Sequence, residues 1–233
     1  MFPVPADEGT PLAESLLHVE RTVRPDGLRF DPDAAVRHLA AADPALSLII
    51  ERSPPFSVRP TRTQSLFAAL LESIVYQQLS GKAAETILGR VVALFRPRRF
   101  PRPEDLAVMP DARLRGAGLS RNKTAALKDL ARRTLDGTVP SLARAHAMSD
   151  EELTERLTAV HGVGRWTVEM ILIFRLGRPD VLPVSDLGVR KGFRRAFGMR
   201  RLPASVTMIR RAERWRPYRS VASWYLWRAA ELD

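Results

Sequence analysis

Apolar residues recur at helical spacing along most of the chain. In residues 63–79 they fall at i, i+1, i+4, i+5, i+8 and i+9, which is the stripe of a buried helix: Leu66, Phe67, Leu70, Leu71, Ile74 and Val75. A second stripe, Leu153, Leu157 and Val160, follows Ser149 and the acidic residues 150–152, which mark a helix start. Both patterns predict helices.

Signals for helix starts extend this pattern over the rest of the chain. Asp31 and Asp43 each precede a proline, as an N-cap precedes the first residue of a helix. Residues 24–27 can close one small hairpin, but no convincing set of alternating strands appears. The sequence therefore predicts an all-α protein, with further helices at 81–95, 120–136, 166–176, 187–197, 204–214 and 218–231.

The chain has 233 residues, which suits one large domain or two lobes that share a cleft. We expect two helical lobes. Residues 65–187 form a central lobe, and residues 31–64 pair with residues 188–233 to form the other. Residues 1–30 are expected to be a weakly structured arm with one helix at about residues 11–23.

Composition removes several classes of chemistry. The chain has no cysteine, which excludes disulfides, thiolate catalysis and iron–sulfur clusters, and its four histidines have no metal-ligand spacing. The N-terminus lacks the features of a signal peptide, and no apolar stretch is long enough for a membrane helix. We expect a cytoplasmic protein that does not bind membranes.

The charge points to a polyanionic partner. Lys and Arg number 37 against 26 Asp and Glu, so the formal net charge is +11, and 33 of the basic residues are Arg. A GC-rich genome can explain the preference for Arg over Lys, but it does not explain the excess of positive charge. Nucleic acid is therefore the leading class of partner.

Residues 157–167 carry the most informative motif. A helix ends, Gly162 and Gly164 make a tight turn, and a second helix begins at once. Unpaired amides at a helix start favour an anion, so this turn can hold a DNA phosphate without reading sequence. The candidate DNA-binding residues are His161, Gly162, Val163, Gly164, Arg165 and Thr167. The alternative is a plain helix C-cap followed by a glycine linker.

Asp186 follows the turn by about twenty residues and stands at the start of the next predicted helix. Local evidence alone favours an N-cap, which is the commonest role of Asp at such a position. The helix dipole also favours its negative charge. A carboxylate facing DNA is unfavourable for simple binding, but it is useful where a cationic sugar must be stabilised.

Together these segments resemble the helix–hairpin–helix (HhH-GPD) DNA glycosylases, and within them the AlkA-type 3-methyladenine DNA glycosylase II group. The resemblance runs from about residue 63 to residue 231. It rests on residues 74–80, on Gly118, Leu119, Ser120 and Lys123, on the hairpin with Trp166, on the Asp186 loop, and on residues 213–220 through Trp227.

The resemblance implies a base excision repair enzyme. Such an enzyme flips an alkylated purine, 3-methyladenine or 7-methylguanine, out of double-stranded DNA and hydrolyses its N-glycosidic bond. Asp186 matches the catalytic aspartate. Trp166 stands where bifunctional relatives carry a Schiff-base lysine, which implies a monofunctional enzyme that leaves an abasic site without AP-lyase activity. Trp166 and Trp227 match aromatic residues of the base pocket, to which Met170 and Tyr225 are added as further candidates.

Other roles are carried over from the family in the same way. Gln78 stands where a wedge fills the gap left by the flipped base, with Leu79 and Gln77 as neighbouring candidates. The backbone carbonyls of Thr158, Val160 and Val163 match those that hold a monovalent cation, Na⁺ or K⁺, in relatives. No cofactor is otherwise required, and we expect a monomer.

Three positions depart from the AlkA pattern, and two alternatives stay open. His161 replaces a proline, Met170 a pocket tyrosine and Ser185 an acid, and the large N-terminal β-domain of AlkA does not fit before residue 60. These departures bear on the range of lesions. The same fold can instead act on uracil, mismatched or oxidised bases. A non-catalytic helix–hairpin–helix module that only binds DNA is the second alternative.

Overall fold

The computed structural model describes residues 27–231, and every regular element in that range is helical. The prediction of an all-α protein is therefore confirmed. The predicted helix at 11–23 and most of the N-terminal arm lie outside the described residues. The helices are α2 (Pro32–Ala42), α3 (Pro44–Arg52), α4 (Leu66–Tyr76), α5 (Gly81–Ala93), α6 (Pro103–Val108), α7 (Asp111–Gly116), α8 (Arg121–Leu135), α9 (Leu142–Ala147), α10 (Asp150–Thr158), α11 (Arg165–Phe174), α12 (Leu187–Ala196), α13 (Ser205–Ala212), the 3₁₀ turn η1 (Glu213–Trp215) and α14 (Arg219–Glu231).

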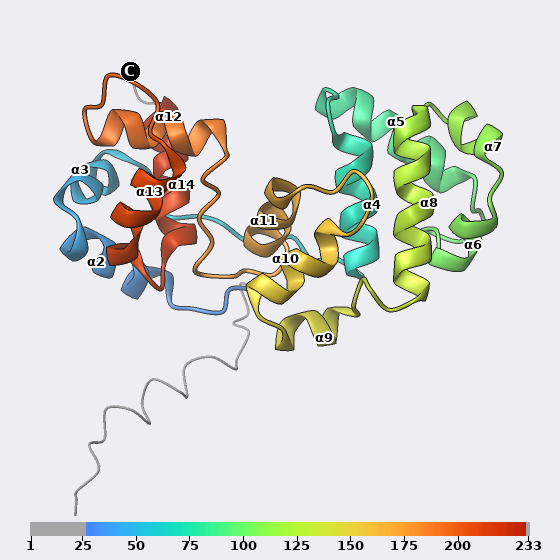
Figure 1. Ribbon diagram of the computed structural model, residues 1–233, viewed down its shortest axis with the longest axis horizontal. Helices are drawn as coiled ribbons and strands as arrows, with labels where there is room; N and C mark the ends of the chain where they lie inside the picture. The colour runs from blue at the N-terminus through green and yellow to red at the C-terminus, as the bar shows by residue number, and fades with distance from the viewer. Residues whose placement is uncertain (1–26, 232–233) are drawn as a thin grey trace, which may run out of the picture.

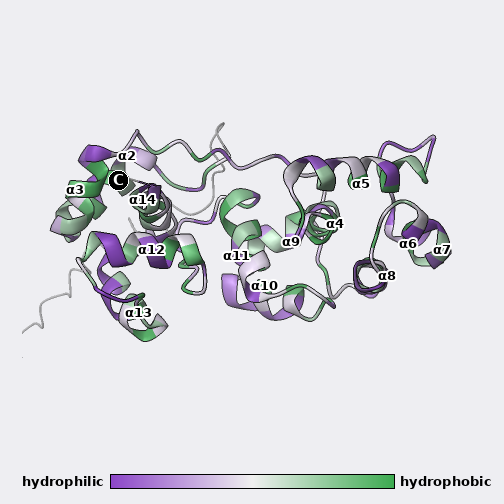
Figure 2. Ribbon diagram, turned by 90° about the horizontal axis from the view of Figure 1, so that it is seen from above, coloured by the Kyte–Doolittle hydropathy of each residue, from purple (hydrophilic) through white to green (hydrophobic). Residues whose placement is uncertain are grey.

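The helices form two lobes, each with its own apolar core (Figure 1). Helices α4 to α11 enclose the core of the first lobe. Helices α2, α3, α12, α13 and α14 enclose the core of the second lobe, so both ends of the described chain contribute to it. Seen from above, the lobes lie side by side along the long axis, and extended segments run between them (Figure 2). The interlobe segments are residues 53–65 and 175–186.

Side-chain caps explain where several helices begin. Asp31 accepts a hydrogen bond from the Asp33 amide at 3.0 Å, and Asp43 accepts one from Ala45 at 3.2 Å, so both predicted N-caps are confirmed. Helix α4 is shorter than the predicted 63–79, because Ser65 caps its start and the chain turns away after Tyr76. The six-residue helices α6, α7 and α9 were not predicted, since such short helices show too little periodicity.

The interlobe segment 175–186 is fixed to the second lobe. Asp180 accepts from Arg219 Nε at 2.7 Å and from Arg216 at 2.6 Å, and the Ser220 hydroxyl accepts from the Val181 amide at 3.0 Å. Beyond this segment α12 packs closely on α14, where a Cβ on Gly192 would lie 1.8 Å from the carbonyl oxygen of Leu226. These contacts determine where the start of α12 lies. Among the described residues, no helix is long and apolar enough to cross a membrane.

Candidate functional site

Asp186 lies where the interlobe segment becomes helix α12. The turn before it is closed by a hydrogen bond of 3.0 Å from the Asp186 amide to the Pro183 carbonyl. Its side chain caps α12, since Oδ1 accepts from the Val189 amide at 2.8 Å. The cap interpretation of Asp186 is therefore correct for the local structure. It holds a half-buried negative charge at the helix N-terminus, where the dipole of α12 is favourable.

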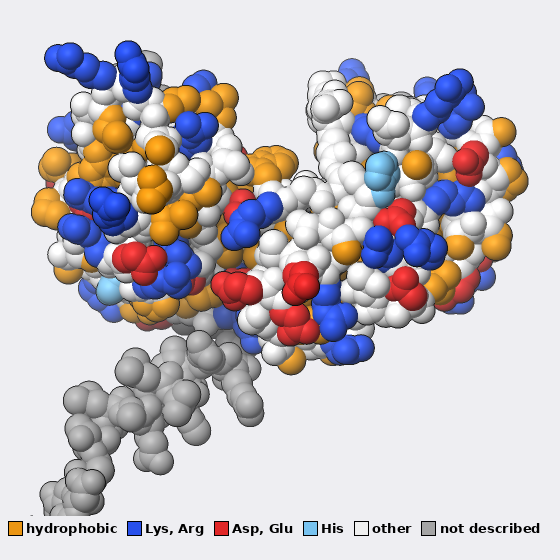
Figure 3. All heavy atoms as spheres, in the orientation of Figure 1, with side chains coloured by type: hydrophobic (Ala, Val, Ile, Leu, Met, Phe, Trp, Pro, Cys, Tyr) orange, Lys and Arg blue, Asp and Glu red, His pale blue; other side chains and the backbone are white. Residues whose placement is uncertain are grey.

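Two tryptophans from different lobes meet at this carboxylate. Trp166 in α11 donates its indole N–H to Asp186 Oδ2 at 2.8 Å, and Trp227 in α14 donates to Oδ1 at 2.8 Å. The structure thus brings together three residues that the sequence analysis singled out. They meet where the first lobe faces the second. The space-filling view shows a deep notch between the two lobes on the upper side (Figure 3).

The two indoles differ in their surroundings. Trp166 is 46% exposed, so its ring is open to a ligand. Trp227 is half-buried, contacts both cores and stacks on Phe174 with ring centroids 5.7 Å apart. Gly188 makes room for it, because a Cβ there would lie 2.7 Å from Trp227 Cδ1 and 3.1 Å from Asp186 Oδ1. The glycine in the first turn of α12 therefore serves this site.

The two other candidate pocket residues are placed differently from each other. Met170 lies one turn after Trp166 on α11 and is half-buried against the core of the first lobe. Tyr225 is only 2% exposed, and its ring packs edge-on against Trp224 at 4.8 Å inside the second lobe. Its placement favours core packing over an edge of a base pocket.

The glycine turn joins α10 to α11 as the sequence predicts. Gly162 has φ +76°, and the Val163 amide donates to the Val160 carbonyl at 3.0 Å to close the turn. Gly164 is the N-cap of α11, and no side chain caps the helix there. The first amides of α11 are therefore left for an anion.

The side chains of the hairpin face two ways. His161 and Arg165 are exposed, and Arg165 pairs with Glu169 at 3.1 Å. Val163 and Thr167 are 5% and 7% exposed, so their side chains pack inward. Of the predicted DNA-binding residues, these two can therefore reach an anion only through their backbone.

Two side chains from neighbouring helices hold the hairpin. Asp129 in α8 accepts from the His161 amide at 2.8 Å, and Gln77 Nε2 donates to the Gly162 carbonyl at 3.0 Å. Burial raises the pKa of Asp129, but hydrogen bonds from the His161 amide and from Arg132 and Arg133 outweigh it and lower the pKa to about 2. The turn is therefore supported from outside the motif itself.

The candidate wedge residues follow α4 directly. Gln78 is exposed and has φ +57°, the left-handed conformation that few non-glycine residues adopt. Leu79 is 39% exposed. Gln77 is half-buried, and its side chain is engaged by the hairpin. Among the three, Gln78 and Leu79 are the residues whose side chains are exposed.

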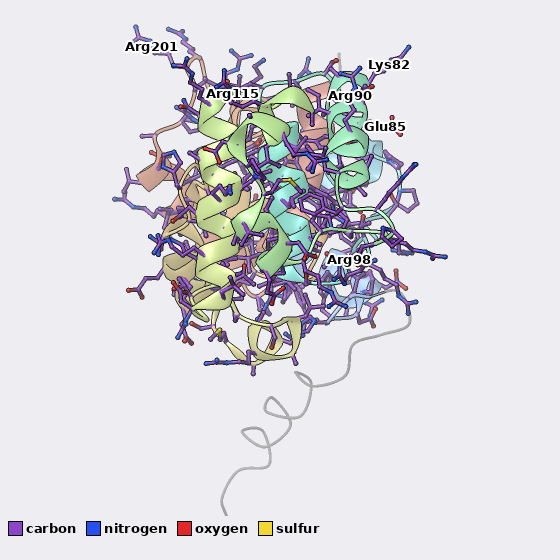
Figure 4. All side chains as sticks on the ribbon, turned by 90° about the vertical axis from the view of Figure 1, so that its right-hand side faces the viewer. Lys82, Glu85, Arg90, Arg98, Arg115 and Arg201 are labelled. Atoms are coloured by element: carbon purple, nitrogen blue, oxygen red, sulfur yellow. The ribbon has the colours of Figure 1, made fainter. Side chains whose placement is uncertain are left out.

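The charges around the site are mixed. Glu169, which is 4% exposed, lines a cavity of about 630 Å³ together with Asp180 and Arg216. Burial raises the pKa of Glu169, Arg165 opposes this, and the charge of Asp186 adds to it. Basic side chains also lie outside this site: Lys82, Arg90 and Arg115 of the first lobe and Arg201 of the second lie toward the top of the view in Figure 4, while Arg98 lies lower and acidic Glu85 lies near Arg90.

Several functional contacts escaped the sequence analysis. The bonds of Asp129 and Gln77 to the hairpin join residues 32 and 85 positions apart, and no local pattern predicts such pairs. Gly188 did leave a signal. A glycine inside a helix costs about 1 kcal/mol relative to alanine, so each such position is a candidate for a close approach, and the structure shows one at Gly188 but none at Gly89.

The chain is similar in sequence to known DNA repair proteins. A family model described as HhH-GPD superfamily base excision DNA repair protein matches residues 71–217. DNA-3-methyladenine glycosylase 1 of Schizosaccharomyces pombe is 38% identical over 177 residues, which are 75% of this chain and 78% of that protein.

Solved structures give the same result. The 3-methyladenine DNA glycosylase of Schizosaccharomyces pombe in complex with abasic DNA matches with a TM-score of 0.73 and 34% identity, over 85% of this chain and 97% of its own. A DNA-3-methyladenine glycosidase of Bacillus halodurans matches with a TM-score of 0.76 and 35% identity, over 84% and 88%.

Proposed function

The chain belongs to the HhH-GPD superfamily of base excision DNA repair proteins, and on that basis we propose that it is a monofunctional DNA glycosylase for alkylated purines. It binds DNA and removes alkylated bases, as the names of its relatives indicate for those proteins. Its substrates are 3-methyladenine and 7-methylguanine in duplex DNA, and its product is an abasic site.

The observation that carries this proposal is the carboxylate of Asp186 between two indole N–H groups, each at 2.8 Å. In the reaction, the C1′–N bond breaks and its electron pair leaves with the base. Positive charge then develops on the sugar, and a fixed negative charge stabilises it. A water oxygen bonds to C1′ and loses a proton to complete the hydrolysis. Trp166 and Trp227 orient the carboxylate through both of its oxygens.

The aromatic rings also fit the base. Alkylated purines such as 3-methyladenine and 7-methylguanine carry positive charge, and stacking on an indole adds a cation–π attraction of roughly 0.5–2 kcal/mol. The 46% exposure of Trp166 leaves its ring accessible, and half-buried Met170 provides an adaptable neighbour. A cationic base is already a good leaving group, so the site requires little acid catalysis.

DNA binding is assigned to the hairpin and the segment after α4. The free amides at the start of α11 hold a phosphate, and the net charge of +11 attracts the duplex. Exposed Gln78, with Leu79 beside it, fills the gap that the flipped base leaves. The residues of the site come from both lobes of one chain, which supports a monomer as the active form.

The absence of AP-lyase activity is part of the proposal. A lyase needs a lysine amine free to attack C1′. Trp166 stands at the hairpin position of that lysine. Two of the four lysines are engaged elsewhere: the amine of Lys123 binds the carbonyls of Val75 and Gln77, and the amine of Lys128 binds those of Ala107 and Met109.

The proposed site for a monovalent cation is the hairpin. Helix α10 ends at Thr158, and carbonyls at a helix end lack intrahelical partners. The carbonyl of Val160 accepts from the Val163 amide and keeps a second lone pair. Together with the carbonyls of Thr158 and Val163, it would hold Na⁺ or K⁺, which would link the hairpin to a phosphate.

The test is release of free bases from methylated duplex DNA by the purified protein, with Asp186→Asn beside it. We expect 3-methyladenine or 7-methylguanine to be released by the wild type and to fall by at least about a hundredfold in the variant. The strand is expected to stay intact until alkali is added. Release of neither base from protein that binds DNA would refute the substrate assignment, and uracil, mismatch and oxidised-base duplexes would then be compared.

A further inference from the structure

Lys123 joins the start of α8 to the end of α4. Its amine donates to the backbone carbonyls of Val75 and Gln77, each at 2.7 Å. The last carbonyls of a helix lack partners within it, and a cation near them is favourable. The amine is partly buried, and burial lowers its pKa. The two carbonyls accept the hydrogen bonds that water would accept from an exposed amine.

The residue that Lys123 holds is tied a second time. Gln77 gives its carbonyl to Lys123 and its side-chain amide to the carbonyl of Gly162, at 3.0 Å. Gln78 follows with φ +57° and an exposed side chain. A non-glycine residue keeps such a conformation only where its surroundings fix it. Lys123 and Gln77 supply that fixation here.

We propose that Lys123 is a positioning residue that holds the DNA gap-filling segment, Gln78 and Leu79, in register with the hairpin at Gly162. The inference rests on the proposed function, because it needs this segment to enter DNA when a base is flipped. Held in this way, the segment and the hairpin approach the duplex as one unit. Lys123 then assists base extrusion and leaves bond cleavage at Asp186 unaffected.

Helix α8 offers a matched control for a merely structural role. Lys128, five residues further on, donates its amine to the carbonyls of Ala107 and Met109 at the end of α6. It also lies 3.7 Å from Asp111. Like Lys123, Lys128 binds two backbone carbonyls at the end of a helix, but α6 carries none of the residues to which we assign DNA binding. Lys128→Met should therefore reproduce the loss of stability of Lys123→Met without its effect on base extrusion.

The experiment compares single-turnover excision of 7-methylguanine from two duplexes. In one the lesion pairs with cytosine, and in the other it faces an abasic-site analogue, so that no base pair has to be broken. We expect Lys123→Met to slow the first reaction by about tenfold and the second by less than about threefold. Lys128→Met should stay within about threefold of wild type on both duplexes. Gln77→Met, which removes the exposed bond to Gly162, should act like Lys123→Met but more weakly.

Equal losses on both duplexes, or a loss no greater than that of Lys128→Met, would overturn the inference. If the wild type excises 7-methylguanine from neither duplex, the proposed function fails, and a second measurement still tests Lys123. That measurement is the fluorescence of 2-aminopurine placed opposite an abasic-site analogue, which reports insertion of a side chain. At saturating protein, Lys123→Met should give less than about half of the wild-type change and Lys128→Met the full change. An unchanged signal in Lys123→Met would refute the role.

Discussion

Trp166 and Asp186 are joined by a hydrogen bond of 2.8 Å, although they are 20 residues apart and lie on elements of different lobes. The bond uses the edge of the indole, so one side of the same side chain orients the carboxylate while its ring remains accessible. Trp227 makes the equivalent bond to the other carboxylate oxygen. The position of the carboxylate therefore depends on how the two lobes meet.

Replacing Trp166 by Phe separates these two uses of the side chain. Trp166→Phe keeps an aromatic ring but loses the N–H that orients Asp186. Because Trp166 is 46% exposed, we expect the free energy of unfolding to change by less than about 0.5 kcal/mol. Loss of a hydrogen bond to a charged group should slow excision by about tenfold, equivalent to about 1.4 kcal/mol. Single-turnover kinetics and urea unfolding of the same preparation measure both quantities.

Trp224→Phe is the matched control. Trp224 is 8% exposed and packs against Phe56 and under Arg228, away from Asp186. This substitution should lower the free energy of unfolding by about 1–2 kcal/mol and leave the excision rate nearly unchanged. If the loss in excision rate relative to the loss in free energy of unfolding were the same in Trp166→Phe and Trp224→Phe, the orienting role of Trp166 would be wrong.

Gly188→Ala tests the packing around Trp227. The added methyl group would lie 2.7 Å from Trp227 Cδ1 and 3.1 Å from Asp186 Oδ1, so the indole must move and its bond to the carboxylate is lost. We expect a fall of at least about tenfold in the excision rate, measured under single turnover. The control is Gly89→Ala in α5, where nothing lies within 4 Å. It should keep full activity and gain up to about 1 kcal/mol in stability. Equal activity in both variants would contradict the assignment.

The sequence predicted the helices that have a periodic apolar stripe or a side-chain N-cap, and it predicted the glycine turn. The apolar stripe from Leu66 to Val75 gave α4, and Asp31 and Asp43 gave the starts of α2 and α3. The glycine pair of the hairpin appeared where the chain turns between α10 and α11. These features depend on residues close in sequence, so their signals are local.

Contacts between distant residues were beyond that reasoning. Resemblance to a family predicted that Trp166 and Trp227 line a base pocket, but nothing in the sequence predicted that both indoles bind the carboxylate of Asp186. The bonds from Lys123 and Asp129 to neighbouring turns had no sequence signal of their own. Tyr225 is a residue that the sequence analysis did single out, but that the structure places in the core. Its type suits both a pocket and a core, and only its 2% exposure separates them.

The buried carboxylate of Asp43 is expected to be the main polar support of the second lobe. It is fully buried, binds Arg211 through two bonds of 2.8 Å, and accepts from the Trp215 indole at 3.1 Å. Asp43→Ala leaves Arg211 unpaired and removes the cap of α3. We expect a loss of about 3–4 kcal/mol in the free energy of unfolding, measured by urea titration. Glu152→Gln, in an exposed pair with Arg156, should cost less than about 0.5 kcal/mol. A loss below about 1 kcal/mol for Asp43→Ala would contradict this view.

Asp129 should make the stability of the protein depend on pH in acid. Its pKa is about 2 in the folded protein against an ordinary 3.8, so its contribution is present above about pH 4 and is lost as the pH falls through about 2. Asp129→Asn removes this dependence. Its side chain is 16% exposed, and we expect a difference of about 1–2 kcal/mol that narrows between pH 4 and pH 2. Urea unfolding from pH 2 to pH 6 measures it. Curves for the two proteins that stay parallel over that range would show that the hydrogen bonds from His161, Arg132 and Arg133 do not favour the charged form of the carboxylate.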